Sequence, residues 1–501
     1  MISNPQLPAA LRYPGAYISI DGSQAGLGGD IPGVLLVGKK FANGTAAIGE
    51  ISRVSSVQDV VNKTGAGSML AQMAKRYRAI DPALDLYILP FADDFGFETR
   101  ARGTLHLSQH PTGVGAGTIS LYIAGHLISI ADTGSNAQNA SNLVGVVNSL
   151  AEVPVTAYYS GVQDNVGGFT IALDAKHAGA CGNDIDLRLN MYGEQSAAQP
   201  IFITAMLAGS GSYLMGNGSG SSTQYDLASI LGDRWYRYVA LGLSDAQTLQ
   251  LWSDEAKRRY LPPIQAGFRA FSAHRGDYAN AAAFGETKNY EHIANLSLGI
   301  NPTTPWEAAA MVCAAAAPRL VNNPTESLEG TPLPGMIGVS YHDWTQANSL
   351  LYKGMSIMQV AKDGSCSIKR LISMYQFRPD GSADDAYLDI NTAETMERIR
   401  YEQRIGAIQR FTGTAAAKSN EGYRPGLRIT TIDDVRAYLL STYQNKLMKE
   451  LGWVQDYPRY KATLIVEQDA QNPSRFNFKD EPVLLSPYYI LAGLAQFRKA
   501  V

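Results

Sequence analysis

The chain has 501 residues, with 42 Lys and Arg against 45 Asp and Glu, so its formal charge is −3. This balance excludes the strongly basic surface that attracts nucleic acids or anionic membranes. Charged residues are 17% of the chain, below the roughly 25% of an ordinary soluble protein, so we expect much of the surface to pack against other protein.

Secretion, membrane insertion and structural zinc are all disfavoured. The longest nearly apolar stretch, residues 308–317, is about half as long as a bilayer span. The first residues lack a basic segment followed by an apolar run, so we expect no secretory signal peptide. Cys181, Cys313 and Cys366 are odd in number and far apart, which favours neither a zinc motif nor a disulfide framework.

The first segment of the chain predicts an extended arm followed by part of an α/β domain. Early prolines disfavour a helix or a central strand, so residues 1–21 are predicted to be an N-terminal arm ending in an alternating strand. Short apolar runs predict buried strands at residues 34–37 and 84–91. The apolar spacing from Met69 to Tyr77 predicts a helix between them.

Residues 95–195 predict a small α+β unit, inserted between parts of a larger domain. A helix is predicted around residues 143–151, and Ala124-Gly125-His126 is predicted to turn a hairpin. The predicted strands of this unit are residues 103–108, 118–124, 127–130, 153–159, 169–175 and 184–191. The following stretch, residues 196–223, is rich in glycine and serine and predicts a flexible linker or surface loop.

Between residues 224 and 340, strand and helix patterns alternate, which is typical of a mostly parallel sheet covered by helices. Ser244 with Gln247, and Thr304 with Glu307, predict capping boxes that open two helices. Asp277 is predicted to cap a third. The strands predicted here are residues 236–243, 267–273 and 292–298.

Residues 341–485 predict a C-terminal α+β domain, and residues 486–501 a second arm. The domain is predicted to contain two long helices, residues 392–411 and 431–451, and strands at residues 365–375, 460–468 and 475–479. Residues 488–497 of the arm are predicted to form a further strand. The last residues are apolar on both faces of an extended segment, so something must cover them. Either they complete this chain's own sheet or they join the sheet of another copy.

The sequence contains no recognisable catalytic or metal-binding motif. A phosphate loop, a G-x-S-x-G elbow, H-E-x-x-H and C-x-x-C are all absent. The glycines of residues 216–220 are spaced almost like a dinucleotide fingerprint, but no strand precedes them and the last interval is wrong. Asp184 and Asp186 lack nearby oxygen ligands for calcium. We therefore predict no catalytic, cofactor-binding or metal-ligating residue and no enzymatic activity.

A series of segments, in one order along nearly the whole chain, connects it with a known family. They read YPGAYISID (13–21), VLLVG (34–38), GSMLAQM (67–73), DLYILP (85–90), GTISLYIAG (117–125), AGACGNDID (178–186) and CSIKRLISMY (366–375). These segments resemble contractile-tail sheath proteins of Mu-like bacteriophages. In that family the central α/β domain is called subtilisin-like, and the absence of a G-T-S-x-A serine motif here agrees with a non-catalytic version.

The resemblance implies a multidomain α/β and α+β fold: a central subtilisin-like domain, an inserted domain, a C-terminal domain and extended terminal arms. The implied boundaries are 1–21 for the first arm, 22–94 for the N-terminal part of the sheath core, 95–195 for the insert, 196–223 for the linker, 224–340 for the central domain, 341–485 for the C-terminal domain and 486–501 for the last arm.

The resemblance also implies a mechanical function without a cofactor. Subunits would stack as hexameric rings into a helical sheath around a tail tube and contract, driving the tube through the host envelope for genome ejection. The implied partners are further copies, the tube protein, and the baseplate and tail terminator proteins, with no contact to nucleic acid and no membrane insertion. The implied location is the virion tail, after assembly in the host cytoplasm.

Two sets of candidate residues follow, both assigned to assembly. Residues expected to join a neighbour's sheet are Tyr13, Tyr17, Ile18, Ile20, Tyr488, Tyr489, Ile490, Leu491, Leu494 and Phe497. Residues expected to contact the tube are Asp433, Asp434, Arg436, Lys446 and Lys449, for which a solvated helix face is the alternative. Two other functions stay open: the sheath of a genome-free injection particle (a tailocin), and a hydrolase built on the central domain.

Overall fold

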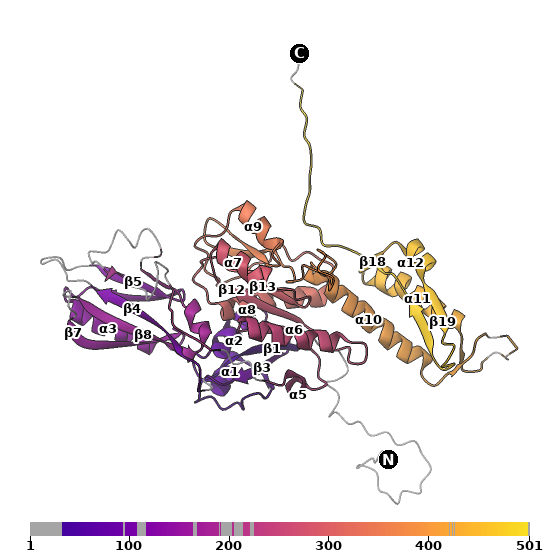
Figure 1. Ribbon diagram of the computed structural model, residues 1–501, viewed down its shortest axis with the longest axis horizontal. Helices are drawn as coiled ribbons and strands as arrows, with labels where there is room; N and C mark the ends of the chain where they lie inside the picture. The colour runs from indigo at the N-terminus through magenta and orange to yellow at the C-terminus, as the bar shows by residue number, and fades with distance from the viewer. Residues whose placement is uncertain are drawn as a thin grey trace, which may run out of the picture.

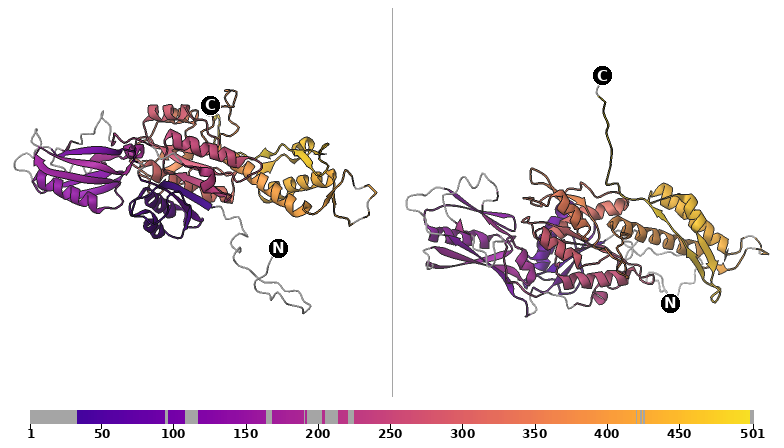
Figure 2. Two further views of the ribbon diagram at one scale, coloured as in Figure 1. Left: turned by 60° about the horizontal axis from the view of Figure 1, so that its bottom comes forward. Right: turned by 45° about the horizontal axis from the view of Figure 1, so that its top comes forward.

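The computed structural model describes residues 33–93, 96–107, 117–163, 168–189, 191, 203–204, 214–220, 225–419, 421–422, 424 and 426–498. The inserted unit, the central unit and the C-terminal unit follow one another along the long axis (Figure 1, Figure 2). The last residues leave the side of the molecule as a narrow extension (Figure 1). The chain is therefore a mixed α/β protein built from several units.

A six-stranded sheet forms the central unit. Its strands, in spatial order, are β13 (Ile293–Ser297), β12 (Arg269–His274), β11 (Tyr236–Leu241), β1 (Gly33–Lys39), β3 (Leu86–Phe91) and β2 (Ser52–Val54). All neighbours are parallel except β2, which runs antiparallel to β3. Every residue of β1, β3 and β11 is buried, as expected where helices cover both faces of a sheet.

The helices of the central unit are α1 (Val57–Thr64), α2 (Met69–Ile80), α5 (Leu227–Leu231), α6 (Ala246–Tyr260), α7 (Tyr278–Glu286) and α8 (Pro305–Asn322). The alanine-rich α8 packs against α2, β11 and β12 and is almost wholly buried. Asp277 caps α7 as predicted, accepting from the Asn280 amide at 2.9 Å.

Neither predicted capping box is formed, although the start predicted for α8, with Thr304 before it and Pro305 as its first residue, is correct. The cap of α6 is Asp245, one residue after Ser244, and it accepts from the Thr248 amide at 3.0 Å. The Thr304 hydroxyl precedes α8 but donates to the Glu307 carboxylate at 2.8 Å. Glu307 in turn accepts from Arg76 at 2.8 Å. The Thr304 hydroxyl thus contacts the Glu307 side chain but accepts no hydrogen bond from a helix amide.

The inserted unit contains a four-stranded and a three-stranded sheet, in the orders β10-β4-β8-β7 and β6-β5-β9. Its elements are β4 (Arg100–Leu107), β5 (Thr118–Ile123), β6 (His126–Ala131), α3 (Asn136–Ser149), β7 (Val155–Gln163), β8 (Phe169–Ala178), β9 (Leu187–Leu189) and β10 (Ile203–Thr204). Ala124 and Gly125 turn the β5–β6 hairpin with φ values of 50° and 79°. The strand predicted at residues 184–191 is shorter, because Ala180–Asp184 form a 3-10 helix.

Buried ion pairs join the inserted unit to the central unit. Lys39, at the end of β1, donates to the Glu98 carboxylate at 2.8 Å and to the Ala178 carbonyl oxygen at 2.7 Å. The Met69 amide, at the start of α2, donates to His177 Nε2 at 2.8 Å. Arg275, just after β12, pairs with the buried Asp186. Because separating such pairs leaves buried charges uncompensated, the two units are firmly held together.

The stretch expected to be a flexible linker, residues 196–223, is paired in both of its described parts: residues 203–204 form β10, which pairs with β4, and residues 214–220 contact the inserted unit. Asn183 accepts from the Gly218 amide at 2.8 Å and donates to the Gly218 carbonyl oxygen at 2.9 Å. Isolated bridges join Gly216 to Arg102 and Ser219 to Thr99. A Cβ on Gly218 would lie 2.6 Å from the Gly179 carbonyl oxygen. Glycine is needed at this position because another backbone lies so close.

The two hydrophobic cores do not separate at residue 341, where the boundary of the C-terminal domain was expected. α9 (Trp344–Leu351), β14 (Ile357–Val360) and β15 (Cys366–Arg370) follow this boundary, yet Met358 and Ile368 belong to the central core. The long helix α10 (Ile390–Phe411) connects both cores, since Ile390 packs in the first and Ile399 in the second.

The C-terminal unit surrounds the second core. Its elements after α10 are β16 (Ala415–Ala416), β17 (Ile429–Thr430), α11 (Ile432–Ser441), a π-helix (Thr442–Glu450), β18 (Val454–Gln455), α12 (Tyr457–Thr463), β19 (Ile465–Gln468), β20 (Phe476–Lys479) and β21 (Val483–Leu484). Two predictions were inaccurate here. The predicted helix over residues 431–451 changes from α to π, and the predicted strand over 460–468 begins as α12, which Asp456 caps.

No helix within the described ranges is both long and apolar enough to cross a bilayer.

Candidate assembly interface

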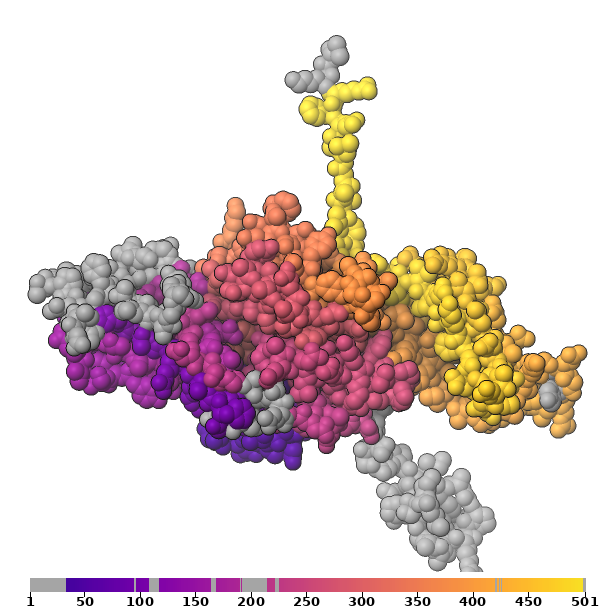
Figure 3. Space-filling model, in the orientation of Figure 1, coloured from indigo at the N-terminus to yellow at the C-terminus, as the bar shows by residue number. Residues whose placement is uncertain are grey.

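An uncovered apolar arm follows β21. Residues 486–498 form no strand pair with any other described part of the chain. Ile490, Leu491, Leu494 and Phe497 are 78–87% exposed, and the space-filling view shows the arm as a thin column rising from the surface (Figure 3). In the structure, residues 486–498 therefore lie apart from this chain's own described sheets, and their exchange between copies stays a prediction from the sequence.

The root of the arm is held in place by contacts that the sequence did not predict. Tyr489 is partly buried, and the guanidinium carbon of Arg370 lies 4.7 Å from the centroid of its ring. Arg370 also pairs with Asp389 at 3.2 Å. Burial raises the pKa of Tyr489, so its phenol stays protonated at neutral pH. No local sequence pattern predicts this role of Arg370, because its partner Tyr489 comes more than a hundred residues later in the chain.

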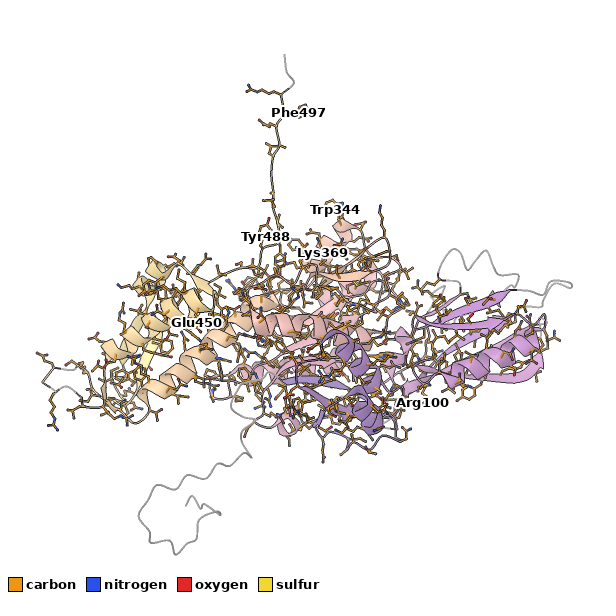
Figure 4. The ribbon with its side chains drawn as sticks, turned by 180° about the vertical axis from the view of Figure 1, so that it is seen from behind. Arg100, Trp344, Lys369, Glu450, Tyr488 and Phe497 are labelled. Carbon is orange, nitrogen blue, oxygen red and sulfur yellow. The ribbon has the colours of Figure 1, made fainter. Side chains whose placement is uncertain are left out.

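Covering the arm would be strongly favourable. Fully burying one large apolar side chain contributes about 1.5–3 kcal/mol, so the four exposed residues together represent roughly 6–12 kcal/mol of gross stabilisation. Figure 4 shows Tyr488 at the root and Phe497 toward the tip, with the arm pointing away from the body. Within the described ranges, this is the segment that most clearly needs another surface.

The candidate arm residues Tyr13, Tyr17, Ile18 and Ile20 lie outside the described residues. They remain a prediction from the sequence.

The charged residues proposed for the tube contact fall into two groups. Asp434 and Arg436 are engaged internally: Asp434 accepts from the Thr431 amide at 2.9 Å, and Arg436 donates to the Leu464 carbonyl oxygen at 2.6 Å. Asp433 and Lys449 are exposed, and Lys446 is partly exposed. The second group is therefore the part of this set that another protein could reach.

A small cavity lies where a ligand site would be expected in an open α/β sheet, at the carboxyl ends of β1, β11 and β12. It has a volume of about 190 Å³ and is lined by residues including Lys39, Cys181, Asp184, Ser244 and His274. Burial raises the pKa of the Cys181 thiol to about 12 and lowers the pKa of His274 to about 4. An unreactive thiol and a weakly basic imidazole do not favour nucleophilic catalysis here.

A serine–histidine hydrogen bond does occur, between Ser297 Oγ and His342 Nε2 at 3.2 Å. Ser297 is completely buried, and only His342 lines the adjacent groove, so a substrate could not reach the hydroxyl. In the described part of the chain there is also no cluster of three His, Cys, Asp or Glu side chains suited to a metal ion. Among the described residues, neither place therefore shows a reachable, activated nucleophile or a metal site.

Comparison with known proteins identifies the family. A Mu-like prophage FluMu tail sheath protein from Haemophilus influenzae is 30% identical to this chain over 503 aligned residues, which cover 99% of each protein. This chain belongs to the Mu-like tail sheath family. The resemblance noted in the sequence is thereby confirmed. No family model matches the sequence.

Solved structures give a weaker likeness to this sheath-family chain. A sheath tail protein from Desulfitobacterium hafniense is 13% identical with a TM-score of 0.46, covering 94% of this chain and 100% of that one. The contracted PVC sheath complex of an extracellular contractile injection system is 11% identical with a TM-score of 0.46, covering 99% of both. The family assignment depends on the Haemophilus relative and not on these structures.

Proposed function

We propose that this chain is a mechanical sheath subunit: it polymerises around a tail tube and contracts, which drives the tube through the host cell envelope for genome ejection. The observation that carries this proposal is the apolar arm, residues 486–498, exposed on a member of a tail sheath family. Such an arm needs a second protein surface, and a further copy of the chain supplies one. The virion tail is the corresponding location, after assembly in the host cytoplasm.

The two arms, residues 1–21 and 486–501, would join neighbouring copies by adding strands to their sheets. Main-chain hydrogen bonds of this kind persist while the residues beside them bend, so they can hold subunits together through a change of lattice. The fixed root at Tyr489 and the free tip support this role.

Deletion of residues 486–501 tests the exchange of arms. We expect a folded, soluble monomer that forms no sheaths, as seen by sedimentation and negative-stain microscopy. The matched variant Leu491→Ser/Leu494→Ser keeps the backbone of the arm and removes apolar side chains, and we expect it to assemble poorly as well. Striated cylinders of normal width from the truncated chain would contradict the proposal.

The folded units would move as bodies during contraction, linked by the arms. We divide the chain into a core containing residues 22–94 and the residues from 224 to the first part of α10, an insert at 95–195 with the following segment 196–223, a C-terminal domain and the two arms. The buried pairs of Lys39 and Arg275 support joint movement of insert and core. We place the start of the C-terminal domain inside α10 rather than at residue 341, because the second core begins there.

The energy for contraction would come from contacts that are more complete in the contracted lattice. If each subunit buried a further ~1,000 Å² with half of it apolar, the gross gain would be about 12 kcal/mol. Even a small fraction of that, summed over many subunits, would drive the tube. No nucleotide is needed, which agrees with the absent phosphate loop, and the structural role of the relative supports a protein that is not an enzyme.

The tube would contact the exposed charges of the C-terminal unit, Asp433, Lys446 and Lys449. Exposed charged contacts are individually weak, as a sheath that must release its tube requires. Lys446→Glu/Lys449→Glu should reduce co-assembly with tube protein, and Lys446→Gln/Lys449→Gln should have an intermediate effect. Equal co-assembly with tube protein by the unmodified chain and by both double variants would contradict the tube contact.

The baseplate and tail terminator proteins are the remaining proposed partners, and direct contact with nucleic acid or insertion into a membrane is not proposed. A tailocin sheath would be physically the same object, and neighbouring capsid genes would separate the two. The hydrolase alternative has no support, because Ser297, the serine of the serine–histidine pair described above, is buried out of reach of a substrate.

A further inference from the structure

Helix α9 carries two exposed aromatic side chains that have no role in the fold. Trp344, its first residue, is 81% exposed, and Tyr352, which ends it, is 78% exposed. Leu350 is buried and fixes the helix to the core. Tryptophan and tyrosine are enriched among the residues that dominate protein–protein contacts, so this helix has the composition of an interface.

Two grooves flank α9. One, of about 720 Å³, is lined by residues including Trp344, Leu351, Val360 and Lys369. The other, of about 600 Å³, is lined by residues including Leu351, Tyr352 and Arg370. The helix therefore has a groove of mixed apolar and polar lining on each side, a shape that can hold a complementary protein surface.

This surface is continuous with the root of the C-terminal arm. Arg370 lines the second groove and also lies against the ring of Tyr489. Trp344, Lys369 and Tyr488 lie together on the face from which the arm rises (Figure 4). The root of the arm, the grooves and α9 thus form one surface, which we call the arm face.

The direction of the arm limits what can cover the arm face. The arm points away from this face (Figure 1, Figure 3), and 13 extended residues from 486 to 498 reach at most about 45 Å. A copy that takes up these residues must therefore lie within this distance of the arm face, on the side toward which the arm points. We propose that α9 and its two grooves dock the same neighbouring copy that receives the arm. This inference rests on the proposed function, since it presumes that copies bind one another's arms.

The contact would be heterologous, because α9 would meet a different surface of the neighbouring copy. Heterologous contacts that do not close into a ring build open helical polymers, the form a sheath needs. Exposed pairs, Lys369 with Glu329 and Lys353 with Glu286, supply polar groups beside the aromatic residues. This arrangement of an apolar centre and a polar rim is typical of interfaces between separately soluble proteins.

Tryptophan fluorescence offers a direct test in the full-length chain. Of the five tryptophans, Trp252, Trp306 and Trp453 are buried and Trp235 is partly buried, so quenching by iodide chiefly reports Trp344. We expect the quenchable fraction to fall when monomers assemble into sheaths, and Trp344→Phe to remove that change. A Trp344 as quenchable in sheaths as in monomers overturns the proposal.

Substitutions give an independent readout. Trp344→Ala and Tyr352→Ala should each raise the concentration needed for assembly at least about tenfold, with the thermal unfolding of the monomer unchanged. Tyr158→Ala is the matched control, because Tyr158 is 53% exposed on β7, a strand of the inserted unit, which lies away from α9 (Figure 1). It should assemble like the unmodified chain.

The outcomes separate this inference from the proposed function. If the α9 variants assemble normally while deletion of residues 486–501 prevents assembly, the inference is overturned and the proposed function stands. If the full-length chain never polymerises, both are overturned. If deleting the arm makes Trp344 more quenchable in the monomer, the arm of the same chain covers the arm face. That result overturns the proposal that a second copy covers it.

Discussion

The buried ion pair between Lys39 and Glu98 should dominate the contact between the inserted and central units. Lys39 Nζ donates to Glu98 Oε2 at 2.8 Å and to the carbonyl oxygens of Ala178 at 2.7 Å and Asp93 at 3.1 Å. The two side chains are 1% and 0% exposed. Lys39→Met keeps most of the volume of the side chain and removes all three donated hydrogen bonds.

The magnitude follows from the burial of the partner. Removing one member of a buried ion pair costs about 3–5 kcal/mol, because the other charge stays buried without its counter-ion. Lys39→Met/Glu98→Met removes both charges and loses mainly the two hydrogen bonds to carbonyl oxygens, at about 1 kcal/mol each. The double variant should therefore be more stable than Lys39→Met alone.

Calorimetric unfolding of the monomer, together with limited proteolysis at the joint, measures the effect. The control is Lys75→Met, which removes an ion pair to Glu152 that also joins the two units but is 55% and 49% exposed. An exposed pair contributes about 1 kcal/mol or less. If Lys39→Met destabilises the chain no more than Lys75→Met does, the reasoning from burial is wrong.

Three further predictions concern single positions. Burial raises the pKa of Asp184 to about 7. The folded chain therefore holds this proton more tightly than the unfolded chain, so the free energy of unfolding should fall as pH rises from about 4 to 7. Asp184→Asn should make the melting temperatures at pH 5 and pH 8 more similar, and an unchanged difference would count against this. Arg370→Ala should loosen the arm root and raise the assembly concentration severalfold without unfolding the core, whereas Arg370→Lys should restore part of the loss through its charge over Tyr489. Gly218→Ala should destabilise the insert, since its Cβ would lie 2.6 Å from a carbonyl oxygen. Gly145→Ala, at an exposed position of α3, places a Cβ that meets no atom within 4 Å and should stabilise the fold by about 0.5–1 kcal/mol. Equal melting temperatures for these two variants would refute the contrast.

Predictions from local patterns succeeded where one segment contains the whole signal. The apolar run at residues 34–37 predicted β1, the spacing from Met69 to Tyr77 predicted α2, and Ala124-Gly125 predicted a hairpin turn. They failed where two local signals compete. Ser244 and Asp245 are both good caps, and residues 460–468 alternate like a strand although Asp456 and Pro458 begin a helix there.

The sequence by itself determined the main helices and strands, the family and the apolar character of the last arm, because each depends on residues close together in the chain or on their order along it. Only the tertiary structure decided that β1 and β3 share a sheet with β11–β13 across the insert, that Lys39 meets Glu98, and that the C-terminal arm and Trp344 lie uncovered on one face. The physical reason is that hydrophobicity is local and non-directional: an apolar segment has the same composition whether its own chain covers it or another chain does.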